Sequence, residues 1–302
     1  MVSFDALYRS FFGSSVEVAP EYLLLSLPIA WLAYKLGRRS GGFWRWLLPR
    51  RIYAHPSHRL DLVLFVIGRL LAFSGIFTRL SAAPLVAAGV VRLIGRDPAA
   101  PPLLGPVALA LLMWVLSDFL LYWIHRWFHH LRPLWPLHAV HHSAEVLTPF
   151  TAFRQHPGAL LVSSVVYSVL IGAAQGVLVG TLDPDTTIAT IAGINAFIVL
   201  AHAALANFQH SHVWISYGRV LEHVFISPAQ HQIHHSTDPA HYGRNFGTML
   251  ALWDWMFGTL YVIRGAEDIT FGLTDRDDAP LATHRLGPVM LSPLRRMIGA
   301  RP

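Results

Sequence analysis

Two short segments of this chain are rich in histidine, with the spacing of a single helix face. Six of the eighteen histidines fall between His125 and His142, directly after a long apolar run. A second group, His231, His234 and His235, follows later in the chain, again beyond apolar segments. Imidazole is a good ligand for borderline metals and is largely uncharged at neutral pH. This pattern therefore indicates a metal site.

The spacing within each segment brings the imidazoles together if the segments are helical. His125 and His129 are four residues apart, and such residues share one helix face. His138, His141 and His142 have the i, i+3, i+4 arrangement, which the later group repeats. One metal ion rarely binds more than about six ligands, so eight convergent imidazoles predict a pair of metal ions. Imidazole suits zinc, copper, iron and nickel alike, so ligand type does not identify the metal.

The composition is that of a membrane protein. The chain is 54% hydrophobic and only 13% charged, whereas soluble domains carry about 25% charged residues. There is no cysteine, which excludes disulfides, iron–sulfur clusters and thiolate-bound haem. The net charge of +6 comes from arginines in short loops between apolar runs, a placement that fits anionic lipid headgroups better than nucleic acid. We expect an integral protein of a bacterial-type inner membrane that binds no nucleic acid.

Five apolar stretches predict membrane-spanning helices, which need about twenty residues each. They run at about 22–36, 60–77, 107–124, 160–179 and 187–205, and the shorter stretch 84–94 is expected to be interfacial or re-entrant. Arginines after the first stretch mark the cytoplasmic side, and the alternation of spans then places both histidine groups on that side. The predicted fold is an all-α, polytopic membrane helical bundle of about 4–5 spans with a cytoplasmic, helical, histidine-rich metal-binding cap.

The histidine segments resemble a known enzyme superfamily. HRWFHH from His125, HAVHHS from His138 and HQIHHS from His231 are similar to the histidine boxes of the fatty acid hydroxylase/sterol desaturase superfamily. Its members are integral-membrane, non-haem diiron oxygenases. The flanking sequences resemble the superfamily too: DFLLYWIHR at 118–126, DPAHYGRNFG at 238–247 and WDWMFGT at 253–259.

This resemblance implies a division of the chain and a cofactor. Residues 105–262 are expected to form a fatty acid hydroxylase-like catalytic domain. Residues 1–104 are expected to hold N-terminal membrane spans and a basic loop, and residues 263–302 a C-terminal tail. In the superfamily, the histidine boxes hold two iron ions, and dioxygen is the co-substrate.

The resemblance also implies which histidines bind the metals. They are those of the three boxes, with His210 as the match to a histidine that relatives have between the second and last boxes: His125, His129, His138, His141, His142, His210, His231, His234 and His235. His130, beside His129, and His202, on the fifth apolar stretch, are open alternatives. No catalytic residue beyond the metal ligands is expected.

Six further polar residues are expected to support the ligands or to contact substrate. Asp118 lies seven residues before His125 on the same helix face, and a buried carboxylate there is expected to fix a ligand imidazole through its other nitrogen. The others are Arg154, His156, His212, Asn245 and Asp254. The remaining histidines considered, His55, His58, His223 and His284, are expected at the surface.

A two-metal polyhistidine site at a membrane surface fits oxidation of an unactivated C–H bond in a lipid. The predicted activity is dioxygen-dependent hydroxylation of a fatty acyl, sterol or isoprenoid substrate; desaturation with the same site is the alternative. The sequence has no GxGxxG motif and no cysteine for iron–sulfur ligation, so we expect electrons from a separate reductase with a ferredoxin or cytochrome donor. A membrane metal-binding or transport protein is a weaker alternative, because its ligands would lie along the spans.

Overall fold

The structure, a computed structural model, describes residues 4–13, 16–95, 101, 103–182 and 206–299. Within these residues the regular elements are helices, and the only β-type pairings are two isolated bridges. The all-α prediction is confirmed for this part of the chain. The fifth predicted span, 187–205, lies outside the described residues, as does His202.

Three segments are long and apolar enough to cross a membrane, judged by length and composition: Ile76–Ile94, Val107–His130 and Pro157–Thr181. The second and third correspond to α8 (Pro106–His130) and α10 (Pro157–Thr181), as predicted. The first consists of α6 (Ile76–Leu80) and α7 (Ala83–Ile94), with two residues between them. The stretch 84–94, expected to be interfacial or re-entrant, is therefore part of a longer apolar segment that begins at Ile76 and is long enough to cross a membrane.

The first two predicted spans form helices that are shorter or more charged than the three candidate spans. The stretch 22–36 lies in α2 (Pro20–Leu36), whose 17 residues fall short of the usual length of about twenty. The stretch 60–77 lies in α5 (Pro56–Phe73), which carries Arg59, Asp61 and Arg69 and ends before Phe77. Neither α2 nor α5 is among the three candidate spans of the described residues.

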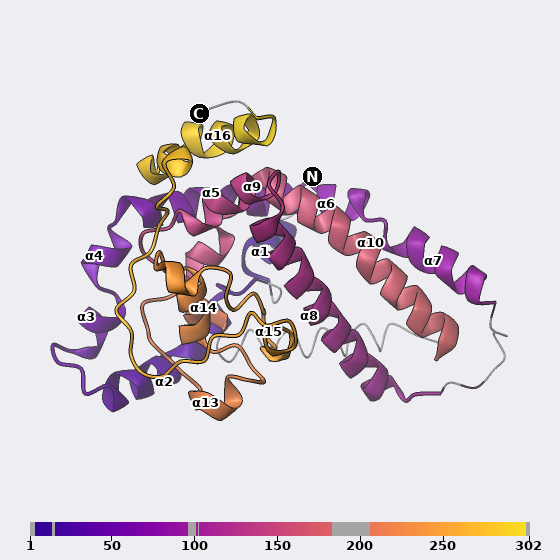
Figure 1. Cartoon of the computed structure of the whole chain (residues 1–302), viewed down its shortest axis with the longest axis horizontal. Helices are drawn as coiled ribbons and strands as arrows, with labels where there is room; N and C mark the ends of the chain where they lie inside the picture. Colours follow the sequence, from indigo (N-terminus) through magenta and orange to yellow (C-terminus); the bar gives the residue numbers. More distant parts are fainter. Residues whose placement is uncertain (1–3, 14–15, 96–100, 102, 183–205, 300–302) are drawn as a thin grey trace.

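A row of glycines lets α7 and α10 pack closely, and Figure 1 shows the two helices side by side. Gly172, Gly176 and Gly180 recur every fourth residue of α10. A Cβ atom on Gly172 would lie 2.6 Å from the carbonyl oxygen of Ala83, and one on Gly176 would lie 2.6 Å from Cβ of Val90. Small residues at this spacing permit close helix approach within a bilayer. The α6–α7 segment is thus held against α10, which also contacts α8.

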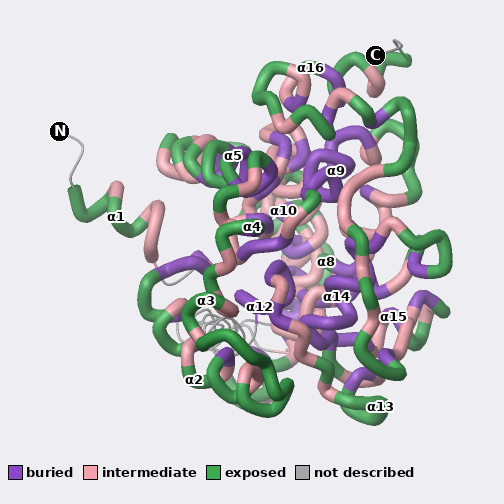
Figure 2. The backbone as a smooth tube through the Cα atoms, turned by 90° about the vertical axis from the view of Figure 1, so that its left-hand side faces the viewer, coloured by how far each residue is buried: buried purple, intermediate pink, exposed green. Residues whose placement is uncertain are grey.

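The histidine-rich segments form short, deeply buried helices beside α8. These are α9 (Trp135–His142), α12 (Asn207–Gln209) and α14 (Pro228–His234), and every residue of α14 is buried. Figure 2 shows the buried backbone concentrated there, while α1 has no buried residue. The remaining elements are α1 (Phe4–Phe12), α3 (Phe43–Leu47), α4 (Arg50–Tyr53), η1 (Pro149–Phe153), α13 (Gly218–Leu221), η3 (Pro239–His241), α15 (Leu252–Met256), η4 (Arg276–Thr283) and α16 (Leu286–Met297).

The C-terminal tail is part of the packing around α9. Leu281 of η4 and Val289 of α16 share one apolar cluster with Ala139 and Val140 of α9. Both tail residues are at most 2% exposed. Because α9 carries three of the box histidines, the tail stabilises the element that positions them.

Candidate metal centre

Local sequence signals fix where the histidine helices begin. The Ser227 hydroxyl accepts from the Gln230 N–H, and the Gln230 side-chain oxygen accepts from the Ser227 N–H. Pro228 occupies the first turn. This capping box sets the start of α14. It thereby sets His231, His234 and the following His235 on one face of this helix.

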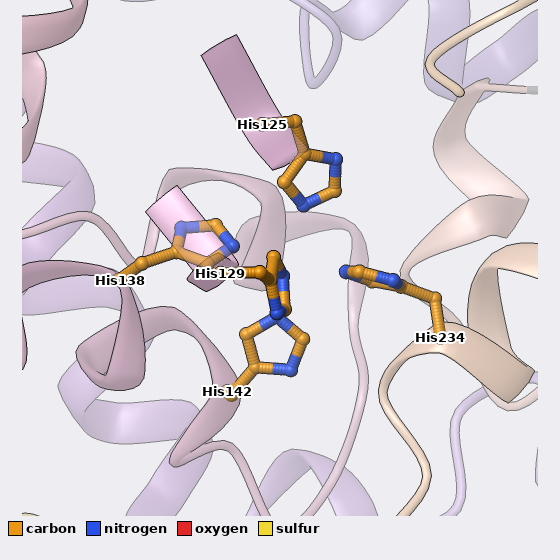
Figure 3. Close-up of side chains that lie close together, drawn as sticks. All are labelled: His125, His129, His138, His142 and His234. Carbon is orange, nitrogen blue, oxygen red and sulfur yellow. The ribbon is translucent and has the colours of Figure 1, made fainter. Parts of the chain in front are cut away.

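The nine histidines expected as ligands converge on one buried region. They form two groups, and within each group one nitrogen per ring lies within 4.8 Å of all the others. The first group is His125, His129, His138, His142 and His234, and the second is His141, His210, His231 and His235. Figure 3 shows the first group, with His234 facing the four rings from α8 and α9.

The two groups adjoin each other. The rings of His142 and His235, one from each group, are stacked with centroids 4.5 Å apart. Within the first group, His234 lies 4.6 Å from His125 and 4.8 Å from His142, centroid to centroid. Two adjoining groups of potential ligands could hold two metal ions.

Unpaired nitrogens in the first group fit a metal ion. The Nε2 atoms of His129, His138, His142 and His234 are buried and have no hydrogen-bond partner among the described residues. A buried polar atom without a partner costs about 1–3 kcal/mol, so four of them around one space call for a common partner. A cation bound by the four lone pairs would supply it.

Two backbone carbonyls orient rings of this group. Nδ1 of His125 lies 2.8 Å from the Phe246 carbonyl oxygen, and Nδ1 of His234 lies 2.8 Å from that of Arg244. A carbonyl can only accept, so each ring carries its proton on Nδ1 and presents a free Nε2 lone pair. This is the usual way in which a protein fixes the tautomer of a metal-binding histidine.

In the second group, Nε2 of His210 lies within hydrogen-bond distance of the other three rings. Nε2 of His210 lies 2.9 Å from Nε2 of His231, and 3.2 Å from Nε2 of both His141 and His235. A neutral imidazole has only one N–H, so four converging Nε2 atoms cannot all be paired with one another. A metal ion at their centre would use all four lone pairs.

Burial keeps these imidazoles in the form that binds metal. It lowers the pKa of His141 to about 3. Burial is also the main cause that lowers the pKa values of His210, His231 and His235, with neighbouring histidines adding to it. Neutral imidazole is the ligand form. The donor set therefore fits two metal ions of the type that nitrogen ligands select.

The structure distinguishes between the adjacent histidines at the end of α8. His129 belongs to the first group, whereas His130 belongs to neither group of the described residues. Nδ1 of His130 instead lies 2.9 Å from the Arg126 carbonyl oxygen, near the surface. The geometry favours His129 as the ligand.

The loop that carries the two orienting carbonyls is itself held by predicted residues. The Asp254 carboxylate accepts from the backbone N–H groups of Phe246, at 2.8 Å, and Gly247, at 2.7 Å. Asn245 has a φ of +54°, a left-handed conformation that asparagine tolerates better than most residues. Its side chain donates to the Gln230 carbonyl oxygen, at 3.1 Å. Asp254 and Asn245 thus support the ligands through the backbone, which sequence patterns do not reveal.

Asp118 does not contact a ligand imidazole, which corrects the sequence expectation. Its carboxylate accepts from the N–H groups of Met249, at 3.0 Å, and Leu250, at 3.2 Å, and from the Trp253 indole, at 2.8 Å. These three donors, rather than His125, are the hydrogen-bond partners of the Asp118 carboxylate. Asp118 instead fastens the segment before α15 to α8.

Arg154 is fully buried, which rules out contact with a lipid head group from this position. Its guanidinium donates to the Val140 carbonyl oxygen, at 2.9 Å, and to the Ser143 hydroxyl, at 2.9 Å. It also pairs with Asp61, at 2.9 Å. Arg154 therefore ties the C-terminal end of α9, with its histidines, to α5.

His156 and His212 likewise make structural contacts. Nδ1 of His156 accepts from the Gly158 N–H at the start of α10, and its Nε2 donates to the Met290 carbonyl oxygen of α16. Nε2 of His212 donates to the Trp46 carbonyl oxygen, at 2.9 Å. Neither belongs to the two groups.

Two histidines expected at the surface are buried. His58 is 6% exposed and lies 3.0 Å from the Thr148 hydroxyl. The His284 side chain is 5% exposed and faces Glu145. Thr148 and Phe150 contact His58, and Glu145 and Arg154 contact His284, which no local pattern indicated. His284, Glu145 and His55 form a third cluster of potential ligands.

Hydrogen bonding argues against metal binding at this third cluster. Nδ1 of His284 accepts from Arg154, at 3.1 Å, and Nδ1 of His55 accepts from the Ser57 N–H, at 3.2 Å. Each ring therefore carries its proton on Nε2, the atom that faces Glu145 at 3.2 Å and 3.8 Å respectively. A protonated Nε2 has no lone pair for a metal.

A cavity of about 400 Å³ opens onto the first histidine group. His129, His142 and His234 form its inner wall, and Tyr242 and Thr274 lie among its other lining residues. Its walls combine polar and apolar side chains. This cavity is a route by which small molecules could reach the proposed metal positions.

Comparison with known proteins agrees with this geometry. Residues 110–259 match the model of the family described as fatty acid hydroxylase. Alkylglycerol monooxygenase of Danio rerio is 30% identical over 153 residues, which cover 51% of this chain and 30% of that protein. The ornithine lipid hydroxylase OlsE of Rhizobium tropici is 27% identical over 188 residues, or 62% of this chain and 52% of that protein.

A desaturase is also similar. Delta(7)-sterol-C5(6)-desaturase of Nicotiana tabacum is 30% identical over 150 residues, covering 48% of this chain and 47% of that protein. The chain thus matches about a third to a half of the length of these curated relatives. No solved structure matches the chain.

Proposed function

We propose that this chain, which belongs to the fatty acid hydroxylase family through residues 110–259, is a membrane-bound diiron oxygenase that hydroxylates a C–H bond of a lipid. The observation that carries the proposal is the pair of adjoining, buried histidine groups with unpaired ring nitrogens. The apolar helices support an integral membrane location.

The nine histidines are the proposed ligands of two iron ions. When bound, the ions would supply activation of dioxygen and removal of hydrogen from the substrate carbon. The protein fixes the ring tautomers through the Arg244 and Phe246 carbonyls. Burial of the Nε2 atoms of His129, His138, His142 and His234 limits their contact with water. The cavity beside His129 is the proposed entry for dioxygen and the reacting carbon.

The relatives support a lipid substrate. Two of the three described above are named as a monooxygenase and a hydroxylase of lipids, and the third as a sterol desaturase. We place hydroxylation first for that reason and desaturation second. The electrons would come from a separate reductase with a ferredoxin or cytochrome, for which the basic loop at 38–51 offers a docking surface.

The activity is tested with the full chain in lipid nanodiscs, reconstituted with iron, a reductase, ferredoxin and a lipid extract. Under isotopically labelled dioxygen, the proposal expects a lipid heavier by one labelled oxygen. A product that gains a double bond without label would assign the chain to desaturation. Turnover without dioxygen, or metal analysis that finds fewer than two irons per chain, would contradict the proposal.

The cytoplasmic placement of the histidine groups has its own test. The chain has no cysteine, so single cysteines can be introduced at the exposed Leu103 and Arg132, beyond the two ends of α8. A membrane-impermeant thiol reagent added to intact cells is expected to label position 103 and not position 132. Labelling of 132 alone from outside would reverse the orientation.

A further inference from the structure

An apolar surface lies on α13 and α15, outside the metal centre. Five large apolar side chains there are between 42% and 81% exposed: Val220, Leu221, Phe225, Trp255 and Met256. Exposed apolar side chains that occur singly are normal, but a contiguous group of them marks a contact surface. This α13–α15 surface therefore calls for a partner.

The five side chains form one surface because the two segments that carry them are joined. The Ala251 N–H, just before α15, donates to the Val224 carbonyl oxygen, just after α13, at 2.9 Å. The rings of His223 and Trp255 make an edge contact, with centroids 5.7 Å apart. The segments of α13 and α15 are thus held side by side.

The α13–α15 surface is continuous with a candidate membrane span. The ring centroids of Phe119 on α8 and Trp253 on α15 lie 5.0 Å apart, as do those of Trp123 on α8 and Phe257. Phe119 and Trp123 are in the last two turns of the apolar stretch 107–124. Figure 1 shows α15 beside α8, and α13 at the opposite end of the view from α16. The level of α15 along α8 is therefore the membrane boundary on the histidine side of the proposed span.

The charges around this surface match those of an anionic lipid headgroup layer. Residues 216–227 and 244–258 contain two arginines and two carboxylates. Both carboxylates, Glu222 and Asp254, are fully buried and accept hydrogen bonds within the protein. The charges left at the surface are those of Arg219, beside Val220, and Arg244, whose guanidinium donates to the carbonyl oxygen of residue 258 after α15. Basic side chains beside exposed apolar ones are typical of surfaces that bind anionic membranes.

We propose that the α13–α15 surface is inserted in the interfacial region of the bilayer on the histidine side. Its apolar side chains reach the ends of the acyl chains nearest the headgroups, and Arg219 and Arg244 lie among anionic headgroups. The inference rests on the membrane location given in the proposed function and not on the oxygenase chemistry. Asp254 of α15 holds the loop whose carbonyl orients His125, so this contact links the proposed ligands to the membrane surface.

The test uses the full chain in nanodiscs of phosphatidylcholine and phosphatidylglycerol. The chain has no cysteine, so a nitroxide spin label can be attached to a single cysteine at Leu221 or Met256 of the surface. Leu111, exposed on α8, is the membrane reference, and Ala282, exposed on η4, is the water reference. Collision rates with oxygen, which dissolves in lipid, and with a nickel chelate, which dissolves in water, report the surroundings of each label. Labels at 221 and 256 should resemble the label at 111, with oxygen favoured over nickel.

Three results would overturn the proposal, and they are distinguishable. Labels at 221 and 256 that resemble the label at 282 would leave the surface in water, while the label at 111 still reports a membrane location for α8. Low collision rates with both reagents, together with dipolar broadening between labels, would place a second copy of the chain on the surface. A water-like label at 111 would remove the membrane location itself.

Lipid composition tests the role of the arginines. In nanodiscs of phosphatidylcholine alone, nickel collisions at a label on position 256 should rise, because the attraction to anionic headgroups is lost. Arg219→Gln should reduce that difference by roughly half, since one of the two arginines remains. Arg276→Gln, which removes an exposed arginine of η4, is the matched control and should leave the difference unchanged. No dependence on composition, or an undiminished one in Arg219→Gln, would overturn the placement of Arg219 among headgroups.

Discussion

In the nine-histidine centre and in the His55–Glu145–His284 cluster alike, potential ligand atoms lie within 4.8 Å of one another in each group, yet the hydrogen bonding of the rings differs. In the centre, backbone carbonyls accept from Nδ1 of His125 and His234, which leaves Nε2 of each ring free to bind metal. In the cluster, Nδ1 of His284 and of His55 each accept from a donor, so the ring protons are on Nε2 and face Glu145. The hydrogen-bond partner of Nδ1, rather than the presence of histidine, decides whether Nε2 of the ring has a lone pair for a metal.

The largest expected effect is loss of one histidine from the centre. His138→Ala or His231→Ala should abolish activity and lower bound metal, because both rings lie within the buried groups. His55→Ala is the matched control and should keep its bound metal. Metal analysis of the purified variants checks the comparison. Full metal content in both centre variants would contradict the ligand assignment.

A smaller effect is expected from Asp254, which holds the loop whose Phe246 carbonyl orients His125. Asp254→Ala removes the acceptor for the Phe246 and Gly247 N–H groups, so the carbonyl that fixes His125 is released. Loss of such a support lowers metal affinity by about 10- to 100-fold. Competition with a chelator measures it. An unchanged affinity would show that the His125 tautomer is set in another way.

The nine-histidine centre should also make stability depend on pH. The folded pKa of His141 is about 3, below the value of about 6.5 in the unfolded chain. As pH falls below about 6.5 the unfolded state binds protons that the folded state does not, so the free energy of unfolding of the metal-free protein decreases, down to about pH 3. Each such histidine contributes about 1.4 kcal/mol per pH unit.

Thermal unfolding of the metal-free protein between pH 7.5 and 5.5 tests this dependence. The wild type should become less stable as pH falls, and His141→Gln should show a shallower slope by about one proton. A stability that stays constant over this interval would mean that the buried imidazoles do not resist protonation.

The smallest effect is expected at the third cluster. Glu145 is 42% exposed and is not part of the centre. Glu145→Gln should change the free energy of unfolding by less than about 1 kcal/mol and leave the metal content unchanged. Denaturation and metal analysis check both. Loss of one metal ion per chain in this variant would turn the cluster into a third metal site.

Much of the helical framework follows from local sequence. Unbroken apolar runs predict α8 and α10, and the spacing of the boxes predicts that His125 and His129, or His138 and His142, share a face. The extent of the α6–α7 segment was missed because it follows α5 with almost no polar residue between them. Charged residues in α5 identify a helix that packs partly within the protein.

What the sequence by itself determined is which histidines could act together as ligands, because helical spacing is a property of neighbouring residues and the boxes resemble those of a known superfamily. What only the tertiary structure decided is the role of each polar partner. Asp118 accepts from backbone donors, Arg154 ties α9 to α5, and His284 of the tail faces Glu145. These contacts join residues far apart in the chain, and many involve backbone atoms, whose positions no pattern of side chains records.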